Sequence, residues 1–430
     1  MLSSTSQERI GISSVENVLC IIAIIHIVII QRKKLTEKIE TSEKWVLIYG
    51  RRKTGKTYIV ENTVSYDDYF FVNRNRTILD KISSQVLDYN TFVAIFLRSV
   101  QQRRTIVIDE FHRLGEEFLD VLHSSRKSGK VILITSTLLL AKKLLSGNSA
   151  LLGLFNEIQV DIISLDDALR ELKDRKVSKK DRLELAILAR EPLAIDYLSS
   201  EDSVHTAVRI LLGSAQSVPA LIGEIFTEEE RVNTMVYNGI MSAVATGNVS
   251  SGRISSYLFS RKLIQKDDPS IVQQYLLNLL KFGLMRRVAI FNKKKFVYKI
   301  QSPLVRLYFY AQEKLGLSER QVSERELVDL VTTVMPRIVE DNVRELISST
   351  EGLVETIIED SDFEVDGYLI KHDKPHIALE VKWRNRVREL HTIESNLRRI
   401  PAESHILFVP DKEVLQSKLI RVVDPDDLLQ

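Results

Sequence analysis

The sequence predicts an α/β protein of several domains, in which a parallel sheet is followed by a helical middle part and a second α/β unit. Three observations support this prediction. An apolar, strand-like run at 45–49 is followed directly by Gly-x4-Gly-Lys-Thr. Residues 161–200 are rich in charge and have helical spacing, and from about 232 the pattern becomes short helices separated by small polar turns. Two strand-like runs at 363–371 and 376–381 contain acidic residues on either side of a turn.

Length and composition limit the classes of protein to which this chain can belong. With 430 residues it is long enough for two to four domains. Hydrophobic residues make up 44% and charged residues 27%, as is typical of a soluble globular protein. The net charge of +2 excludes a whole-chain attraction to nucleic acid, so any such attraction is local. The single cysteine, Cys20, excludes an internal disulfide and a cysteine-based zinc site, and it favours a cytoplasmic location.

The N-terminal part contains an apolar segment, "VLCIIAIIHIVII", at 18–30, which is followed by three basic residues. As a helix it would span about 20 Å, which is short of a hydrocarbon core of about 30 Å. No basic segment precedes it and no small-residue cleavage site follows, so a secretory signal is not expected. We expect a buried element or an unstructured extension, with a membrane anchor as the alternative.

The segment "KWVLIYGRRKTGKTYIVEN" predicts a strand, a phosphate-binding loop and a helix in that order. Glycines let the loop curl so that its N–H groups point at phosphates, and the N-terminus of the helix adds to this attraction. We expect Lys56 to reach the β- and γ-phosphates of ATP and the Thr57 hydroxyl to hold Mg²⁺. The loop residues expected to bind the nucleotide are Gly50, Arg51, Arg52, Lys53, Thr54, Gly55, Lys56 and Thr57.

Two further strands are predicted to end beside this loop. "TIVIDEFHRL" at 105–114 places Asp109 and Glu110 after four apolar residues, where ligands bind in open α/β sheets. We expect Asp109 to hold Mg²⁺ through water and Glu110 to orient or activate the attacking water. "KVILITST" at 130–137 ends in hydroxyl residues, of which Ser136 either senses the γ-phosphate or simply ends the strand.

The segments "VLIYGRRKTGKT", "VIDEFHRL" and "ILITST" together resemble the archaeal-type P-loop ATPases of the STAND group, which are relatives of the AAA+ ATPases. The resemblance covers about 31–200 and implies ATP binding and hydrolysis. "REPLAI" at 190–195 is similar to the family's Gly-x-Pro-Leu-Ala stretch, which implies that Pro192 approaches the nucleotide. Arg190 stands where the family has glycine, and no arginine finger is identified.

The middle part predicts three short helices followed by a β-hairpin, which is the element order of a winged helix. The helices are expected in "VNTMVYNGIMSAVATG", "VSSGRISSYL" and "DPSIVQQYLLNLLKFGL", and the hairpin in "AIFNKKKFVYKI". Basic residues follow the third helix and form the tip of the hairpin, where they would meet DNA phosphates or simply be solvated. These residues are Arg286, Arg287, Lys293, Lys294 and Lys295.

The C-terminal part contains residue types that suit a metal-dependent phosphodiesterase. Asp366 and Glu380 lie on two predicted neighbouring strands, which brings their carboxylates together as ligands for a hard cation such as Mg²⁺. Lys382 leaves the same face of its strand as Glu380 and would stabilise the developing charge. Taken alone, the same residues are equally typical of the solvent-exposed face of an ordinary strand.

The predicted order after about 331 is a helix, three strands, a helix and a strand, with a last strand at the edge. This order resembles the core of the PD-(D/E)xK nuclease superfamily and the nuclease-like domain appended to this ATPase family. The resemblance implies that Glu340 is the superfamily's helical acid. Val365 stands where the superfamily often has a proline.

The fold class is therefore α/β, with a P-loop NTPase parallel sheet, an all-α and winged-helix middle part, and a C-terminal α/β domain of the restriction-endonuclease-like class. The boundaries predicted from the sequence are an N-terminal extension at 1–30, a P-loop ATPase domain at 31–160, a helical lid at 161–230, a winged helix at 231–310, a linker at 311–330 and a nuclease-like domain at 331–430.

Two functions are compatible with these observations. The first is an ATP-hydrolysing switch coupled to a Mg²⁺-dependent nuclease-like domain that acts on DNA. The second is a regulatory ATPase whose winged-helix and C-terminal domains bind nucleic acid or protein without cutting. A protein partner or a homo-oligomer is compatible with both functions.

Overall fold

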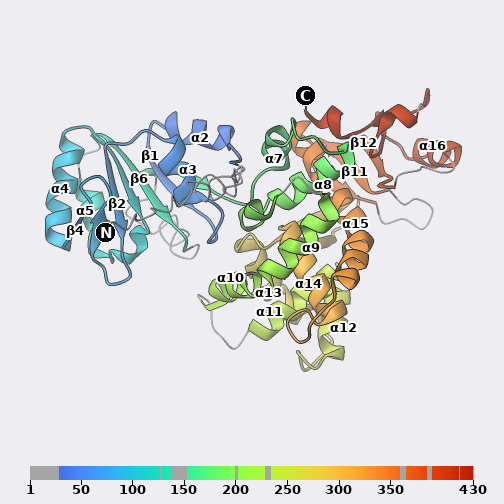
Figure 1. Cartoon of the computed structure of the whole chain (residues 1–430), viewed down its shortest axis with the longest axis horizontal. Helices are drawn as coiled ribbons and strands as arrows, with labels where there is room; N and C mark the ends of the chain where they lie inside the picture. The colour runs from blue at the N-terminus through green and yellow to red at the C-terminus, as the bar shows by residue number, and fades with distance from the viewer. Residues whose placement is uncertain are drawn as a thin grey trace, which may run out of the picture.

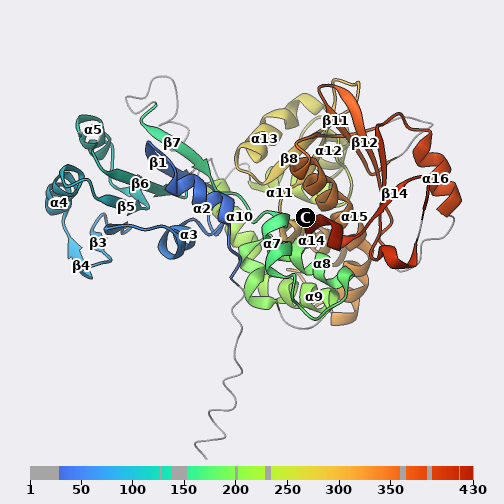
Figure 2. The ribbon, with the colours of Figure 1, turned by 90° about the horizontal axis from the view of Figure 1, so that it is seen from above.

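The computed structural model describes residues 29–125, 128–137, 153–198, 202–227, 234–358, 365–384, 390–415 and 417–429. These residues form two lobes that lie side by side along the longest axis of the molecule (Figures 1 and 2). The N-terminal lobe ends at about residue 160, and the remaining described residues form the C-terminal lobe. The predicted apolar segment at 18–30 lies outside the described residues except for its last two positions.

A seven-stranded sheet forms the centre of the N-terminal lobe, with the order β4-β3-β2-β5-β6-β1-β7. Strands β2, β5, β6, β1 and β7 are parallel, and β3 and β4 add an antiparallel edge. The strands are β1 (Trp45–Tyr49), β2 (Asp68–Val72), β3 (Ile78–Asp80), β4 (Gln85–Leu87), β5 (Thr105–Asp109), β6 (Lys130–Thr135) and β7 (Phe155–Gln159).

Helices cover both faces of this sheet, which explains why its central strands are apolar without alternation (Figure 1). One face packs against α2 (Lys33–Glu40) and α3 (Lys56–Thr63), and the other packs against α4 (Tyr89–Gln101) and α5 (Glu117–Ser124). The predicted parallel α/β sheet is therefore confirmed, with β1 leading into the glycine loop.

The C-terminal lobe begins with helices that surround a single large core. They are α7 (Leu165–Glu171), α8 (Lys179–Ala189), α9 (Ser203–Ser214), α10 (Ser217–Thr227), α11 (Thr234–Ala245), α12 (Ser251–Ser260), α13 (Pro269–Lys281), α14 (Pro303–Leu315) and α15 (Glu324–Thr350). The buried apolar residues of this core extend from Ile163 to Val423, and Ile30 joins them from the start of the described chain. Regions that the sequence assigns to a lid, a winged helix and a C-terminal domain therefore share one core.

The second sheet also has seven strands, in the order β14-β13-β12-β11-β10-β8-β9. They are β8 (Met285–Ile290), β9 (Phe296–Ile300), β10 (Val354–Ile357), β11 (Gly367–Lys371), β12 (Lys374–Val381), β13 (Ser404–Phe408) and β14 (Arg421–Val423). Helix α16 (Leu390–Arg398) covers one face, and the large core lies against the other. The structure thus has the predicted order of helix, three strands, helix and two strands.

The hairpin of the predicted winged helix belongs to this same sheet. After α11, α12 and α13, strands β8 and β9 pair with each other, and β8 also pairs in parallel with β10. The register places Ala289 beside Thr356 and Ile290 beside Ile357. Three helices and a hairpin are therefore present as predicted, but the hairpin forms the end of the C-terminal sheet and not a separate wing.

Helix α15 differs from the sequence interpretation at its start. The segment 311–330, expected as a linker, contains the end of α14, a short turn and the first turns of α15. Ser323 and Glu326 form a capping box that starts the helix, so Pro336, expected in the first turn, lies well inside it. The motif Ser-x-x-Glu was the available signal for this earlier start. None of the helices described in the structure is long and apolar enough to cross a membrane.

Candidate active sites

The glycine loop after β1 approaches the neighbouring chain closely. A Cβ atom at Gly50 would lie 2.2 Å from the backbone oxygen of Val160, so only glycine fits there. Gly55 has a φ of 86° at the residue before α3, and Lys53 also has a positive φ, of 62°. The loop therefore curls around the N-terminus of α3, where backbone N–H groups and the helix dipole favour an anion.

Lys56 is buried inside this loop. Its ammonium group donates hydrogen bonds to the backbone oxygens of Gly50, at 2.9 Å, and Arg51, at 2.8 Å. Burial lowers the pKa of Lys56 to about 8, although Glu110 and Asp109 nearby favour its charged form. The ammonium thus stands where phosphate oxygens would accept its hydrogen bonds.

Thr57 and Asp109 meet beside the loop. The Thr57 hydroxyl donates to Asp109 Oδ2 at 2.8 Å, and the Tyr69 hydroxyl donates to the same oxygen at 3.0 Å. Burial raises the pKa of Asp109 above its ordinary value. A hydroxyl and a carboxylate are hard oxygen ligands of the kind that Mg²⁺ requires, so these residues fit the ion. Tyr69 was not identified from the sequence, because it is an ordinary aromatic residue in the apolar strand β2.

Glu110 lies just after β5 with a left-handed φ of 54°. Its carboxylate accepts a hydrogen bond from the Ser136 hydroxyl at 3.1 Å and lies 3.2 Å from Nδ1 of His112. The structure therefore brings Glu110 and Ser136 together, as their positions after neighbouring strands predict. His112, which the sequence did not indicate, is a third member of this group.

The remaining loop residues have different surroundings. Arg51 is buried and Lys53 is exposed, whereas Arg52 is partly exposed. The Thr54 hydroxyl donates to the Arg51 backbone oxygen at 3.0 Å, which closes the loop on itself. Pro192, expected near the nucleotide, begins a 3-10 helix at Pro192–Tyr197.

Arg51 connects the loop to the C-terminal lobe. Its guanidinium donates to Glu191 Oε2 at 2.5 Å, and the Ser302 hydroxyl donates to the same oxygen at 2.7 Å. Arg190, at the position where the resembling family has glycine, points instead to Glu345 of α15. Glu191 therefore binds the glycine loop directly, and the sequence contains no motif that indicates this contact.

The four candidate residues of the C-terminal site come from three parts of the fold. Glu340 lies in α15, and Asp366 directly precedes β11. Glu380 lies in β12, and Lys382 directly follows that strand. Burial raises the pKa of Glu340 to about 7, and the charges of Asp366 and Asp341 add to this effect. Lys382 is partly desolvated, but its ion pair with Glu380 raises its pKa above the ordinary value.

The detailed contacts of this site limit what it can bind as it stands. Asp366 Oδ2 accepts a hydrogen bond from the Val381 backbone at 2.8 Å. Glu380 is paired with Lys382, whose ammonium takes the place of a cation at that carboxylate. In the described part of the chain, no three His, Cys, Asp or Glu side chains converge closely enough to hold a metal ion. A Mg²⁺ site here would accordingly consist of one or two carboxylates and water.

The basic residues of the hairpin separate into two groups. Arg286 points inward, where its guanidinium pairs with Glu355 and Glu345 and donates to the Asp341 backbone oxygen at 3.1 Å. Arg287 is exposed and lies over the ring of Phe296 at 4.6 Å. The tip residues Lys293, Lys294 and Lys295 are exposed. Only the outward-facing residues are placed where they can meet a large ligand.

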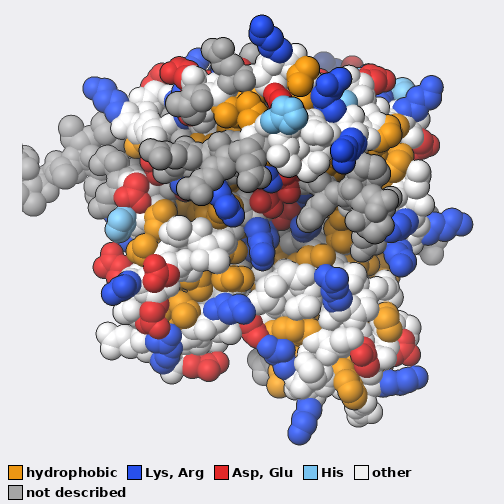
Figure 3. All heavy atoms as spheres, turned by 90° about the vertical axis from the view of Figure 1, so that its right-hand side faces the viewer, with side chains coloured by type: hydrophobic (Ala, Val, Ile, Leu, Met, Phe, Trp, Pro, Cys, Tyr) orange, Lys and Arg blue, Asp and Glu red, His pale blue; other side chains and the backbone are white. Residues whose placement is uncertain are grey.

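Figure 3 shows the face of the C-terminal lobe that lies to the right in Figure 1. Lys and Arg side chains are spread over this face, and a group of acidic side chains lies near its middle. Strand β12 and helix α16 belong to this side of the molecule. The distribution of charge is therefore mixed, without a continuous basic stripe in this view.

Comparison with known families identifies the N-terminal lobe. A family model described as an AAA domain matches residues 42–169, which include the glycine loop and the strand that ends in Asp109. Residues 42–169 thus form an AAA domain, and the lobe is a nucleotide-binding ATPase domain. The match covers less than a third of the chain, and no curated protein matches the sequence.

Solved structures show only a distant likeness. A Walker-type ATPase of Pyrococcus abyssi is 19% identical with a TM-score of 0.48, covering 65% of this chain and 96% of that chain. The ORC2 protein of Aeropyrum pernix, solved in ADPNP and ADP complexes, is 11% identical with a TM-score of 0.39, covering 70% and 91%. A STAND protein of Pyrococcus horikoshii with a tetratricopeptide repeat sensor is 18% identical with a TM-score of 0.32, covering 76% and 50%. At these values the likeness assigns no function to the C-terminal lobe.

Proposed function

We propose that this protein is an ATP-driven switch whose C-terminal lobe acts on DNA as a Mg²⁺-dependent nuclease. The observation that supports the proposal most directly is that one chain contains two groups of residues suited to phosphate and Mg²⁺. One group is built on the glycine loop, and the other gathers Glu340, Glu380 and Lys382 on the C-terminal sheet and α15.

In the N-terminal lobe each residue has a distinct role in ATP hydrolysis. The Lys56 ammonium binds the β- and γ-phosphates, and the Thr57 hydroxyl with Asp109 would hold Mg²⁺, which when bound would neutralise phosphate charge. Glu110 takes a proton from the attacking water, and Ser136 and His112 hold its carboxylate in place. Pro192 borders the nucleotide, as the resemblance to the ATPase family implies.

In the C-terminal lobe Asp366 and Glu380 would hold Mg²⁺, which when bound would polarise the phosphodiester and lower the pKa of a water. Lys382 stabilises the charge that develops on the phosphate. Glu340 completes the polar group from α15, and its raised pKa reflects both burial and the neighbouring carboxylates. The exposed residues of the hairpin, Arg287 and Lys293 to Lys295, supply sequence-independent phosphate contacts.

The alternative is a regulatory ATPase whose C-terminal lobe binds nucleic acid or a protein without cutting. The ion pair between Glu380 and Lys382 and the lack of a three-carboxylate group among the described residues favour this alternative. It retains the same ATP site and the same exposed basic residues. The two proposals therefore differ only in the chemistry of the C-terminal group.

A cleavage assay separates the two functions. Purified full-length protein is incubated with single-stranded, double-stranded and branched DNA, with and without ATP, Mg²⁺ and Mn²⁺. The nuclease proposal predicts that the wild type cleaves DNA and that Glu380→Ala abolishes cleavage while ATP turnover continues. Lys56→Ala should abolish ATP turnover through the loss of ATP binding, and any effect of ATP on cleavage should disappear with it. DNA binding without cleavage, equal in the wild type and Asp366→Ala, is the result that supports the regulatory alternative.

A further inference from the structure

Two adjacent residues after α8 link the glycine loop to α15, the helix that carries one residue of the second candidate site. Glu191 binds Arg51 of the glycine loop, and Arg190 binds α15, the helix that contains Glu340. Both side chains are buried, with 3% exposure for Arg190 and none for Glu191.

The contact of Arg190 with α15 is strong and directed. Its two terminal nitrogens donate to Glu345 at 2.7 and 3.0 Å, and it also donates to Asn342. Arg190 Nε donates to the backbone oxygen of Ile163 at 3.1 Å, and the Ile163 N–H donates back to the Arg190 oxygen at 2.8 Å. A planar guanidinium in this geometry fixes the position of α15 relative to α8.

The contact of Glu191 with the loop is incomplete. Among the described residues, Arg51 Nη1 and Glu191 Oε1 are both buried and without a hydrogen-bond partner. The other carboxylate oxygen accepts from Arg51 and from Ser302, which caps the N-terminus of α14. Buried polar atoms without partners cost free energy, so an anion that binds Arg51 more strongly than Glu191 does would replace Glu191 at the guanidinium.

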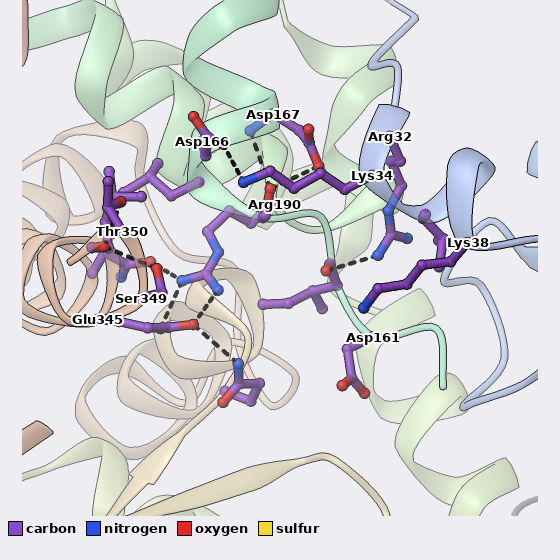
Figure 4. A pocket seen from close by; sticks show the side chains of 17 residues that line it. Arg32, Lys34, Lys38, Asp161, Asp166, Asp167, Arg190, Glu345, Ser349 and Thr350 are labelled. Carbon is purple, nitrogen blue, oxygen red and sulfur yellow. Dashed lines mark hydrogen bonds and ion pairs between the residues drawn. The ribbon is translucent and has the colours of Figure 1, made fainter. Parts of the chain in front are cut away.

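A nucleotide in the glycine loop brings such a partner. Its phosphates compete with Glu191 for the guanidinium of Arg51, because both are anions and Arg51 belongs to the loop that surrounds the phosphates. A buried carboxylate without its cation raises the free energy of the folded protein, so Glu191 and the adjacent Arg190 must move. A cavity of about 410 Å³ between the lobes is lined by Arg190, Glu345 and Arg32, so Arg190 has room to move when Glu191 shifts (Figure 4).

We infer that the dipeptide Arg190–Glu191 transmits the nucleotide state of the glycine loop to α14 and α15, and so to the position of Glu340. This inference rests on the proposed function, because it requires ATP in the loop. It assigns positioning roles and not catalytic ones, since neither residue touches the reacting atoms. The identity of position 190 matters here, because glycine could make none of these side-chain contacts.

Hydrogen exchange of the full chain, measured with and without ATP and Mg²⁺, tests the inference independently of cleavage. In the wild type we expect ATP to change the exchange rates of α15 amides by about tenfold, a typical size for coupling between sites. Glu191→Gln keeps the shape and the hydrogen bond from Ser302 but removes the competing charge. This variant should bind ATP more tightly than the wild type while α15 no longer responds.

Arg190→Gln is the complementary variant, because it leaves the Arg51–Glu191 pair in place. ATP should still change exchange at the start of α14 in this variant, but not in α15. Arg261→Gln, which breaks the distant pair of Arg261 with Glu313, is the control and should behave as the wild type does. Circular dichroism checks that all variants fold. If Glu191→Gln does not, Ser302→Ala breaks the hydrogen bond from α14 to Glu191, and α14 should then lose its response to ATP.

ATP affinity, measured separately with a fluorescent analogue, distinguishes the possible failures. If the wild type binds ATP but its α15 does not respond, or if α15 responds in Glu191→Gln and Arg190→Gln as it does in the wild type, the relay is overturned while ATP binding remains. If the wild type does not bind ATP, the proposed function fails and the relay fails with it. A loss of the α15 response in both variants, with ATP binding retained, supports the relay.

Discussion

Thr57 donates its hydroxyl hydrogen to Oδ2 of Asp109 at 2.8 Å, which joins the start of α3 to the end of β5. These residues are far apart in the sequence, and in the sheet β6 lies between β5 and β1, the strand that leads into the loop before α3. Their contact places the two oxygen ligands expected for Mg²⁺ side by side. The individual parts of the nucleotide site can be tested separately.

Asp109→Asn should remove the effect of Mg²⁺ on nucleotide affinity, because an amide is a much weaker ligand for a hard cation than a carboxylate. Calorimetry with ADP, with and without Mg²⁺, measures this effect. Tyr69→Phe is the matched control: it deletes one hydrogen bond to the same oxygen and should cost about 1 kcal/mol of stability while the Mg²⁺ effect remains. An undiminished Mg²⁺ effect in Asp109→Asn would contradict the assignment.

ATP affinity should fall as the pH rises through about 8, since burial lowers the pKa of Lys56 to about 8 and only its protonated form attracts phosphate. Bound phosphate favours the charged form, so ATP binding at pH 8.5 should take up protons. Calorimetry in buffers of different ionisation enthalpy detects this uptake. Lys56→Arg stays charged over this range, so any binding that it retains should lack both effects. Proton uptake in that variant would point to another group.

Glu110→Gln should bind ATP but lower the turnover number by about 10²–10⁴-fold, as expected when a general base is lost. The amide can still interact with Ser136 and His112, so the surrounding contacts are largely kept. A steady-state phosphate-release assay measures turnover, and a fluorescent nucleotide measures binding. Turnover close to that of the wild type would assign the base to another residue.

Glu340→Gln should change how stability depends on pH. Burial first, and the charges of Asp366 and Asp341 second, raise the pKa of Glu340 from 4.5 to about 7. Between these values the folded protein binds more protons than the unfolded chain, so this contribution to stability is full below pH 4.5 and is lost as the pH rises through 7.

Glu340→Gln has no carboxyl group to titrate, so it does not lose this contribution as the pH rises. Between pH 5 and pH 8 its free energy of unfolding should therefore rise by about 1–2 kcal/mol relative to that of the wild type. Urea unfolding at the two pH values measures the difference. Glu351→Gln, an exposed change just after α15, should show no such gain. Parallel pH profiles for the wild type and Glu340→Gln would mean that Glu340 is not perturbed.

Arg286→Gln should destabilise the protein by about 2 kcal/mol, because Glu355 and Glu345 each lose one of two partly buried cationic partners and keep only Arg344 and Arg190, respectively. Replacing Lys293, Lys294 and Lys295 together by glutamine should change stability by no more than about 0.5 kcal/mol, because all three are exposed.

DNA binding should show the reverse pattern if the hairpin tip contacts phosphates. The triple lysine variant should bind DNA more weakly and with a smaller dependence on salt, whereas folded Arg286→Gln should bind as the wild type does. Fluorescence anisotropy at several salt concentrations measures both quantities. Equal salt dependence in the wild type and the triple variant would exclude the hairpin tip as a DNA contact.

Local patterns were sufficient for much of this protein. The glycine loop, the strands that end in Asp109 and Ser136, and the elements around Glu380 were all predicted from apolar runs, turn residues and short motifs. Such features depend on neighbours in the sequence, so periodicity indicates them. The long helix α15 was missed at its start because the capping box at Ser323 was not used.

The sequence by itself determined the nucleotide chemistry, because the residues from Gly50 to Thr57 act within one continuous loop. The tertiary structure decided which elements share a core and which side chains face each other. It placed the hairpin at the end of the C-terminal sheet, turned Arg286 inward, and joined Arg51 to Glu191 across the two lobes. The physical reason is that these contacts join residues far apart in the chain, and no local preference specifies which distant partner a buried charge will find.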